Sequence, residues 1–590
     1  MPTLSFFATH YAALAVFAVA CWGLGRALLA RFVAPARGDA GLETALAAGA
    51  GLGMVVVLFQ LLAIARALSA GTVLAVVGLG LVSAAMHLPG AIRRIRACEP
   101  SPHFANRLEK IALALLLMLA LPTLIAPLAP PAAYDELMYH LPYAREVART
   151  GSLVVAEWLR YPWFPYNFNL VYAGALLVGD DVLPHLMSAF AGWLSVWMVY
   201  RLGLRHAGRI TGCIAAVTWM LVGDYASALI DTSVALFVLS ACIALWWWHE
   251  QAPARDARWL ALAAFLLGVA AGSKYQALTV TPLVALFVIR REQRLRVLLP
   301  VLLCFLVPCV YWYARNAILT GDPFNPIGAR LFGFTNWNAG DYKRQLDDVQ
   351  AHASWPNAVL WGLVLVPFCR AWKQSAALRA AAVFSAYSLF VWALTSRYPR
   401  YLTASVPLLA LVAVVGWQGL LGGLLGLLRR WMPRMDRNGS FELIGRSLAV
   451  LVVVTAVFAT LQLGRQRLAG VAVTTAQRQA FLEGHVPGYA VMDYLREHAK
   501  GRTYQIALSE AIYYGPSPVW GDTLGPWRYV DFLLLPPAEF ARKLGGLGFE
   551  ALAVSADTVP VLEAKPGFLD HFQPVFAKDG AKAYRILPHE

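Results

Sequence analysis

Long apolar runs separated by short polar segments dominate the pattern along this chain. Many runs reach about 18–25 residues, the length of a helix that crosses a hydrocarbon core of about 30 Å. The pattern predicts about fourteen such helices, at 8–30, 43–65, 69–89, 110–129, 184–203, 208–223, 226–248, 257–273, 276–290, 297–316, 357–371, 379–395, 401–427 and 446–464. The first run lacks a preceding basic segment, so we expect a retained helix rather than a cleaved signal.

Composition agrees with a membrane-embedded chain. Of the 590 residues, 59% are hydrophobic and 14% are charged, and the mean hydropathy is +0.57. A soluble domain has about 45–50% apolar and about 25% charged residues. We therefore expect a mainly α, polytopic transmembrane helical bundle and exclude a water-soluble fold.

The net charge of +15 reflects membrane topology rather than nucleic-acid binding. Its basic residues lie between the apolar runs instead of forming one basic patch. Most of them fall in one set of alternate loops, represented by Arg26, Arg93, Arg201, Arg290 and Arg429. By the positive-inside rule this set is cytoplasmic. We therefore predict a multi-pass protein of a bacterial inner membrane, with its N-terminus and its C-terminal segment on the periplasmic side.

Three segments on the predicted outer side are longer than simple connections: 130–183, 317–356, and the chain after about 465. Long loops gathered on one face favour a functional role. The tail reads as a small α/β domain. Its expected helices are Gly488–His498 and Pro537–Leu544, and its expected strands are Tyr504–Ser509, Tyr529–Leu535, Ala551–Ser555 and Ala583–Leu587. The predicted domains are 1–108 (additional helices), 109–465 (a membrane core) and 466–590 (the periplasmic domain).

Cysteine usage indicates no disulfide framework and no zinc site, because no pair has CxxC spacing. The seven cysteines lie in apolar runs or in predicted cytoplasmic loops: Cys21, Cys98, Cys213, Cys242, Cys304, Cys309 and Cys369.

Polar side chains gather at the outer ends of several predicted helices. Asp135 and Glu136 follow a membrane helix, and Asp231 lies about 7–8 Å along a span entered from outside. Acids at this depth are costly and are candidates for function. Structural alternatives are an acidic helix N-terminus for the first pair and a packing hydrogen bond for Asp231.

Cations lie at the same level of the membrane. Lys274 occupies a short outer turn, Arg315 and Asn316 end another helix, and Arg400 precedes Tyr401 on a third. For Lys274, the alternative is ordinary snorkelling of the ammonium to lipid head groups. Together, the acids and cations suit sugar transfer from an anionic lipid-linked donor: the cations hold the phosphate, and a carboxylate takes the acceptor proton.

These motifs resemble the GT-C membrane glycosyltransferases, particularly the branch of protein O-mannosyltransferases and lipid A aminoarabinose transferases. The resemblance extends over roughly residues 110–410. It rests on Asp135-Glu136 with Tyr139 and Arg145, Ile230-Asp231, Gly272-Ser273-Lys274-Tyr275, Arg315-Asn316…Thr320-Gly321-Asp322-Pro323-Phe324, and Arg400-Tyr401-Leu402…Pro407.

The resemblance implies an inverting transfer from a polyprenyl-phosphate sugar to a lipid, glycan or protein acceptor. It implies Asp135 as base or acceptor-orienting group, Glu136 in support and Asp231 as a second acid. It also implies a substrate-binding set consisting of Tyr139, His140, Arg145, Lys274, Tyr275, Arg315, Asn316, Arg400 and Tyr401. Within that set, Lys274 and Arg315 would contact the donor phosphate, with Arg400 a further candidate.

His140 departs from the best-known branches, and a structural histidine is the alternative there. No metal and no cofactor are expected, because members with monophosphate donors use protein cations, and Asp135-Glu136 lacks D-x-D spacing.

Two other function classes compete with this hypothesis. A lipid or solute transporter would tend to show paired halves and charges near the bilayer midplane, whereas the acids here lie near one face. A non-catalytic envelope-polymer assembly protein would use the outer domain for binding. Release of polyprenyl phosphate from a sugar donor would distinguish the enzyme from both.

Overall fold

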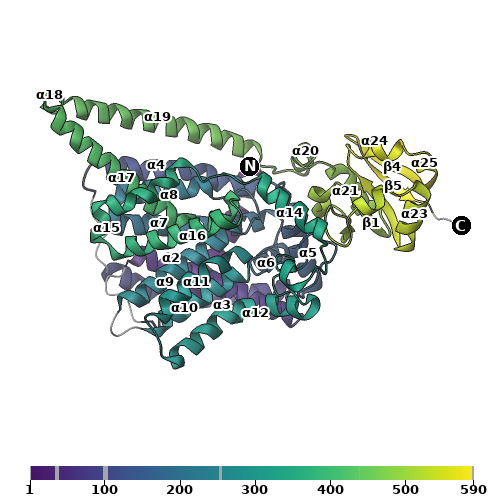
Figure 1. Ribbon diagram of the computed structural model, residues 1–590, viewed down its shortest axis with the longest axis horizontal. Coiled ribbons are helices and arrows are strands. Elements are labelled where there is room, and N and C mark those ends of the chain that lie inside the picture. Colours follow the sequence, from purple (N-terminus) through teal and green to yellow (C-terminus); the bar gives the residue numbers. More distant parts are fainter. Residues whose placement is uncertain (1, 33–38, 98–103, 252–255, 438, 588–590) are drawn as a thin grey trace.

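The computed structural model describes residues 2–32, 39–97, 104–251, 256–437 and 439–587. It consists of a helical bundle and a smaller domain with a sheet, at opposite ends of an elongated molecule (Figure 1). Cys98 lies outside the described residues, and the six cysteines within them are free.

Ten helices within the described ranges are long and apolar enough to cross a membrane. The molecule is therefore a multi-pass membrane protein. These helices are α1 (Pro2–Leu29), α2 (Ala40–Ile64), α3 (Ala70–Ala97), α4 (Arg107–Ile125), α7 (Val182–Ala207), α9 (Asp231–Glu250), α12 (Leu295–Thr320), α16 (Ala376–Thr395), α17 (Val406–Trp431) with the preceding η5 (Pro399–Ser405), and α19 (Ser440–Ala469).

These ten long helices coincide with ten of the fourteen predicted ranges. Four of the predicted ranges hold shorter apolar helices: α8 (Arg209–Val222), α10 (Ala257–Ala271), η3 with α11 (Tyr275–Val280 and Thr281–Ile289), and η4 (Ala358–Phe368). The apolar segment near 168–180 forms another short helix, α6 (Asn169–Val178). α8 packs against α4, α7 and α17, whereas only Val288 of α11 is buried.

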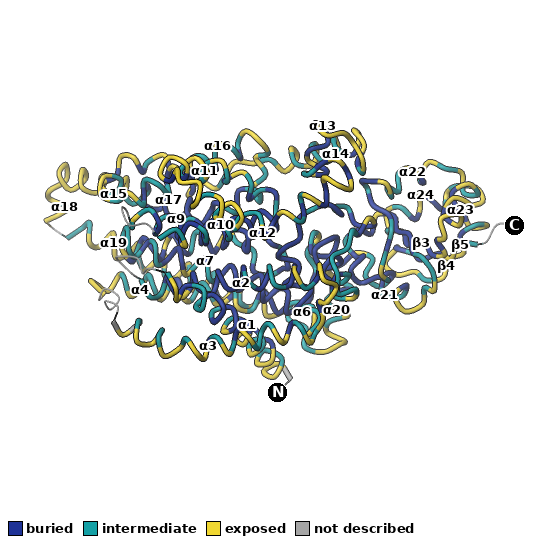
Figure 2. The backbone as a smooth tube through the Cα atoms, turned by 90° about the horizontal axis from the view of Figure 1, so that it is seen from below, coloured by how far each residue is buried: buried dark blue, intermediate teal, exposed yellow. Residues whose placement is uncertain are grey.

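Burial is greatest through the middle of the bundle, whereas α3 and α18 (Pro433–Arg437) are largely exposed (Figure 2). Figure 1 shows α19 running along the outside of the bundle, beside α4. Most of its apolar side chains face outward, as expected for a helix in contact with lipid.

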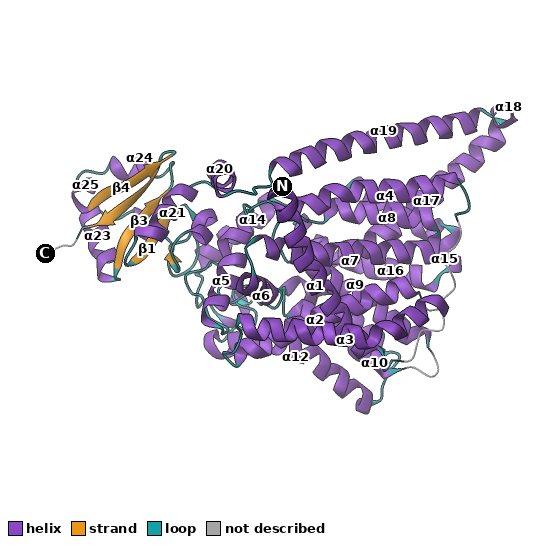
Figure 3. Ribbon diagram, turned by 180° about the vertical axis from the view of Figure 1, so that it is seen from behind, coloured by secondary structure: helices purple, strands orange, loops and turns teal. Residues whose placement is uncertain are grey.

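Short elements cover the end of the bundle next to the small domain. They are η1 (Ala126–Leu128), the π-helical turn η2 (Glu136–His140), α5 (Leu141–Thr150), α13 (Ala329–Phe332) and α14 (Ala339–Ala351). A capping box between Asn338 and Asp341 begins α14. At the other end of the bundle lie α15 (Arg370–Gln374) and α18 (Figure 3).

The tail forms one five-stranded mixed sheet of order β2-β1-β3-β5-β4. Its strands are β1 (Arg502–Ile506), β2 (Val519–Trp520), β3 (Phe549–Val554), β4 (Phe572–Lys578) and β5 (Ala581–Ile586). β1 runs parallel to β2 and β3, and β5 runs antiparallel to β3 and β4. The accompanying helices are α20 (Thr475–His485), α21 (Tyr489–His498), η6 (Ser509–Tyr514), α22 (Val530–Leu533), α23 (Pro537–Gly546), α24 (Val559–Glu563) and α25 (Phe568–His571).

The predicted tail elements are mostly confirmed. The expected helices correspond to α21 and α23, and three of the expected strands correspond to β1, β3 and β5. The expected strand Tyr529–Leu535 is wrong, because this segment contains the helical turn α22. Strands β2 and β4 were not anticipated. The sheet encloses its own core, which includes Tyr504, Leu552 and Tyr584.

Candidate functional site

Four charged side chains form a continuous chain at the tail-facing end of the bundle. The Lys274 ammonium lies 2.6 Å from one carboxylate oxygen of Asp231, and Arg400 Nε donates to the other oxygen at 2.8 Å. The same guanidinium pairs through Nη1 with Asp135 Oδ2. Acids and cations alternate, so their formal charges cancel. The structure thus brings together the two separate acids and two cations that the sequence singled out.

Four separate segments position these groups. Asp231 is the first residue of α9, so the helix begins later than the predicted range 226–248. Lys274 is extended immediately before η3, and Arg400 lies in the first turn of η5 after Pro399. Asp135 immediately precedes η2. π-Helical turns are rare and frequently occur at functional sites.

Gly272 allows the turn that carries Lys274 to pack closely. A Cβ at this position would lie 2.1 Å from Asn167 Nδ2 and 2.8 Å from the Pro308 carbonyl oxygen. Real Cβ atoms essentially never approach so closely. The backbone N–H of Asn167 donates to the Gly272 carbonyl at 2.9 Å, which fixes the turn against the preceding loop.

The charged chain opens into a cavity of about 930 Å³. Small-molecule sites commonly have volumes of about 300–1,000 Å³. Aromatic rings form one wall: Tyr161 stacks on Phe164 at 4.3 Å, and Tyr139 meets Tyr161 edge-on at 5.1 Å. His140, Tyr275 and Tyr401 also line the cavity. The arrangement offers a polar end beside a wall of ring faces, which suits a ligand that is partly charged and partly apolar.

Electrostatics keep Asp135 ionised. Burial alone would favour the neutral acid, but the Arg400 guanidinium outweighs it and holds the pKa of Asp135 below its usual value. Tyr139 adds a hydrogen bond from its hydroxyl to Asp135 Oδ2 at 3.3 Å. In this arrangement Asp135 is a weak base.

His140 is a neutral ring whose tautomer follows from its neighbours. Burial, assisted by the positive charge of Arg400, lowers the pKa of His140 to about 3. The Asn169 amide nitrogen donates both to His140 Nδ1 at 3.0 Å and to the His140 carbonyl oxygen at 3.1 Å. Because Nδ1 accepts, the ring proton lies on Nε2, which has no partner among the described residues. His140 therefore presents one N–H donor at the cavity wall.

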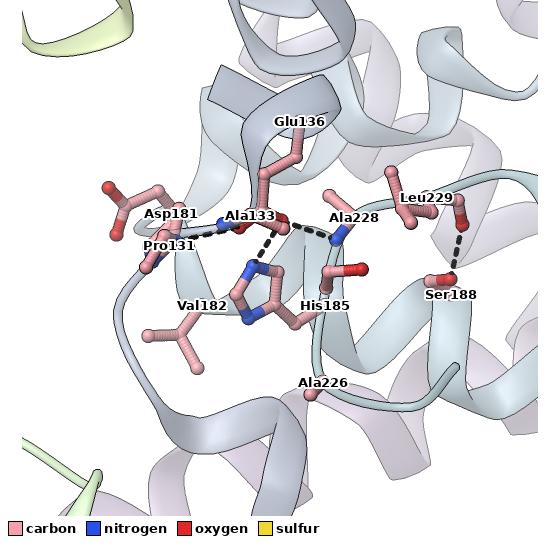
Figure 4. Close-up of polar contacts among 12 residues, drawn as sticks. Pro131, Ala133, Glu136, Asp181, Val182, His185, Ser188, Ala226, Ala228 and Leu229 are labelled. Carbon is pink, nitrogen blue, oxygen red and sulfur yellow. Dashed lines mark hydrogen bonds and ion pairs between the residues drawn. The ribbon is translucent and has the colours of Figure 1, made fainter. Parts of the chain in front are cut away.

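Glu136 lies outside the cavity, contrary to its expected place beside Asp135. Its carboxylate accepts from the backbone N–H groups of Ala132 and Ala133 at 2.7 Å and of Ala228 at 2.6 Å. Ala132 and Ala133 share Oε1, and His185 Nε2 lies 2.9 Å from Oε2, the oxygen that also accepts from Ala228 (Figure 4). The side chains of Asp135 and Glu136 leave the backbone in different directions. Glu136 therefore links the loop before η2 to the segment before α9, through Ala132 and Ala133 on one side and Ala228 on the other.

Three further expected residues lie behind the cavity wall. Arg315 donates to Asn316 Oδ1 at 2.8 Å and lies over the rings of Trp163 and Trp312. Asn316 donates to the Trp163 carbonyl at 2.8 Å and to the Tyr275 hydroxyl at 3.1 Å. Arg145 donates to the Tyr513 and Gly515 carbonyls and thus attaches α5 to the tail.

Sequence reasoning missed cavity residues whose partners lie far along the chain. Arg160 lines the cavity and pairs at 2.6 Å with Asp522 of the tail. Gln345 of α14 accepts from the Tyr161 hydroxyl at 2.8 Å. Thr523 and Leu524 complete the wall from the tail. Two features of the sequence indicate that these segments reach the cavity: the unusual length of segment 317–356, and the aromatic and glycine-rich composition of the tail.

Over the described ranges, no group of three or more His, Cys, Asp or Glu side chains is placed to hold a metal ion. Metal-independent chemistry remains a prediction.

Comparisons with known proteins follow the same division between bundle and tail. Residues 168–312 match the family described as dolichyl-phosphate-mannose-protein mannosyltransferase, which confirms the resemblance over the segment holding Asp231 and Lys274. Residues 477–585 match a second family, described as SF2091/S2213.

Two curated relatives come from Shigella flexneri. SF2093/S2215 is 37% identical over 86 residues, which is 14% of this chain and 43% of that protein. SF2092/S2214 is 38% identical over 47 residues, which is 8% of this chain and 26% of that protein. The chain therefore spans less than half the length of each relative.

Among solved structures, ArnT from Cupriavidus metallidurans bound to undecaprenyl phosphate is 15% identical, with a TM-score of 0.48. That similarity covers 81% of this chain and 98% of ArnT. The Archaeoglobus fulgidus oligosaccharyltransferase is 11% identical, with a TM-score of 0.45, over 80% of this chain and 72% of that protein.

Proposed function

We propose that this protein is an inverting membrane glycosyltransferase that transfers a sugar from a polyprenyl-phosphate donor to a lipid, glycan or protein acceptor. We place the reaction at the outer face of a bacterial inner membrane. The observation that carries the proposal is the Lys274–Asp231–Arg400–Asp135 chain at the edge of an aromatic cavity. The match of residues 168–312 to mannosyltransferases with a dolichyl-phosphate donor supports the donor class. Residues 1–108, 109–465 and 466–590 would be the added helices, catalytic core and periplasmic domain.

In the proposed reaction, an acceptor hydroxyl attacks the anomeric carbon of the sugar. The bond from that carbon to the phosphate oxygen breaks, and polyprenyl phosphate leaves with the bonding electrons. Lys274 and Arg400 stabilise the phosphate charge that develops. Asp135 accepts the hydroxyl proton, Asp231 orients both cations, and Glu136 acts as a positioning residue because it contacts only the wall.

Donor binding would also activate Asp135. Arg400 contacts both Asp135 and Asp231, so a donor phosphate must compete with these carboxylates for its guanidinium. When the phosphate draws Arg400 away, Asp135 loses its nearest positive charge and its pKa rises. The base would then become stronger only when a donor is present, which limits proton uptake in the empty site.

The test uses the purified full chain, a panel of polyprenyl-phosphate sugars and a panel of candidate acceptors. The readout is release of polyprenyl phosphate. Asp135→Asn should lower the rate by about 10²–10⁴-fold, the usual contribution of a general base, while donor binding persists. Asp347→Asn is the matched control, because Asp347 is exposed on α14 and does not line the cavity.

Two results would reject the proposal. One is an unchanged release rate in Asp135→Asn with a folded protein. The other is movement of a labelled sugar lipid across liposomes with no cleavage of its glycosidic bond, which would indicate a transporter.

A further inference from the structure

A second cavity, of about 490 Å³, lies at the end of the bundle opposite the charged chain. Its walls come from the C-terminal parts of α7 and α9, from α11, and from the first turns of α16 and α17. α9 connects the two cavities: Asp231 is its first residue, and His249 lies eighteen residues later. At 1.5 Å per residue, these positions are about 27 Å apart, close to the thickness of a hydrocarbon core.

The charged side chains that line this second cavity are all basic, and one of them, Arg205, pairs at 3.7 Å with Glu250 outside the lining. The described lining contains no Asp or Glu. Its basic residues and histidines are Arg205, His206, His249, Arg290, Arg291 and Arg379. The Arg290 side chain is exposed and makes no hydrogen bond or ion pair within the described part of the chain. Arg379 donates to the Trp372 carbonyl at 2.7 Å, which holds it near the start of α16. Ala376 and Ala377 bring the positive N-terminal end of that helix to the same wall.

The rest of the lining is apolar and opens toward the side of the bundle. Trp246, Leu283 and Leu411 belong to the inner wall. Leu286 and Val383 also line the cavity, although they are 48% and 54% exposed. These side chains lie on helices of the membrane region, where exposed apolar surface faces lipid. The opening is therefore accessible to an acyl chain.

We infer that this cavity binds an anionic phospholipid of the surrounding leaflet. Its phosphate would contact Arg290 and Arg379, and one acyl chain would enter between α9, α11 and α16. Basic pockets between transmembrane helices commonly hold such head groups on the cytoplasmic side, the side that the positive-inside pattern predicts for this end. A free phosphate would leave the apolar wall uncovered, and a zwitterionic lipid such as phosphatidylcholine would bring a quaternary ammonium that the basic lining repels. The inference is independent of the proposed glycosyl transfer.

The test measures lipid binding to the full chain in a neutral detergent by native mass spectrometry. The probes are phosphatidylglycerol, phosphatidylcholine, a polyprenyl monophosphate and inorganic phosphate. We expect one site that binds phosphatidylglycerol at least tenfold more tightly than phosphatidylcholine. Arg290→Gln combined with Arg379→Gln should weaken it about tenfold. Arg296→Gln should not, because Arg296 is also exposed near this end of the bundle but lies outside the cavity.

A steric variant separates this cavity from general surface charge. Ala380→Trp places an indole in the cavity wall without removing a cation, and it should also weaken phosphatidylglycerol binding about tenfold. Thermal unfolding of each variant checks that the chain remains folded. Equal affinity for both phospholipids, unchanged binding in the arginine pair or in Ala380→Trp, or preferential binding of polyprenyl monophosphate or inorganic phosphate would each overturn the inference.

Discussion

Arg400 is central to the charged chain because its guanidinium contacts both Asp135 and Asp231. Since Arg400 holds the pKa of Asp135 below its usual value, Asp135 stays ionised until the pH falls below the ordinary carboxylate range. We therefore expect the acid limb of kcat/KM, which reports the free enzyme, below about pH 4. The acid limb of kcat, which reports the enzyme–donor complex, should lie at higher pH. In that complex the donor phosphate competes for Arg400, and the pKa of Asp135 therefore rises.

Substitution of Arg400 tests the cause of that limb. Arg400→Gln should move the acid limb of kcat/KM to higher pH, because Asp135 loses the charge that favours ionisation. Arg397→Gln is the control, since Arg397 is an exposed arginine three residues away, and the ion pairs of Asp135 and Asp231 are made by Arg400 and Lys274. An identical limb in the wild type and Arg400→Gln would contradict the role given to Arg400.

Glu136 illustrates a residue that is adjacent in sequence but different in role. It is completely buried, and its carboxylate has three backbone donors and His185 as partners. Glu136→Gln replaces one acceptor oxygen by an N–H₂ group that faces donors, so the free energy of unfolding should fall by about 3 kcal/mol. Denaturant titration of the purified protein measures it. The control, Glu157→Gln at an exposed position, should change the free energy of unfolding by less than about 0.5 kcal/mol. Equal changes in the two variants would contradict the structural role given to Glu136.

At the scale of elements, apolar periodicity predicted where helices occur better than where they end. Each predicted span overlaps a helix, but the range 226–248 begins five residues before α9 and the range 446–464 is shorter than α19 at both ends. Hydropathy counts apolar side chains and does not show how many residues of an apolar range join the helix. Strand β4 was missed because most of its residues are exposed, so it lacks alternating burial.

The site shows the same limit. Asp135, Asp231, Lys274 and Arg400 could be found from sequence because charge beside an apolar run is costly and therefore conspicuous. Arg160 could not, because its partner Asp522 lies 362 residues further along the chain. Local sequence carries no signal for such a pair, and only the docking of the tail brings the two residues together.

At the scale of the whole molecule, the tail completes the cavity through ion pairs that join distant segments. Arg160 pairs with Asp522 at 2.6 Å, and Arg528 pairs at 2.6 Å with buried Asp341 of α14. Thr523 and Leu524, between these pairs, line the cavity. One face of the sheet packs on a core within the tail, whereas Ala551, Ala553 and Ala583 on the other face belong to the core shared with the bundle. Docking and cavity shape are therefore coupled.

That coupling predicts a selective effect of Asp522→Asn. The Asp522 and Arg160 side chains are 7% and 12% exposed, and removing one partner of a buried pair costs about 3–5 kcal/mol. Hydrogen exchange should therefore speed up together in residues 155–165 and 519–528, while β1, β3 and β5 stay protected. Asp531→Asn is the matched control: Asp531 also pairs with an arginine, but it is 45% exposed, so its loss should cost less than about 1 kcal/mol. Unchanged exchange in 155–165 would show that the pair does not hold the tail in place. Equal loss of protection in β1 and β3 would show unfolding of the domain rather than undocking.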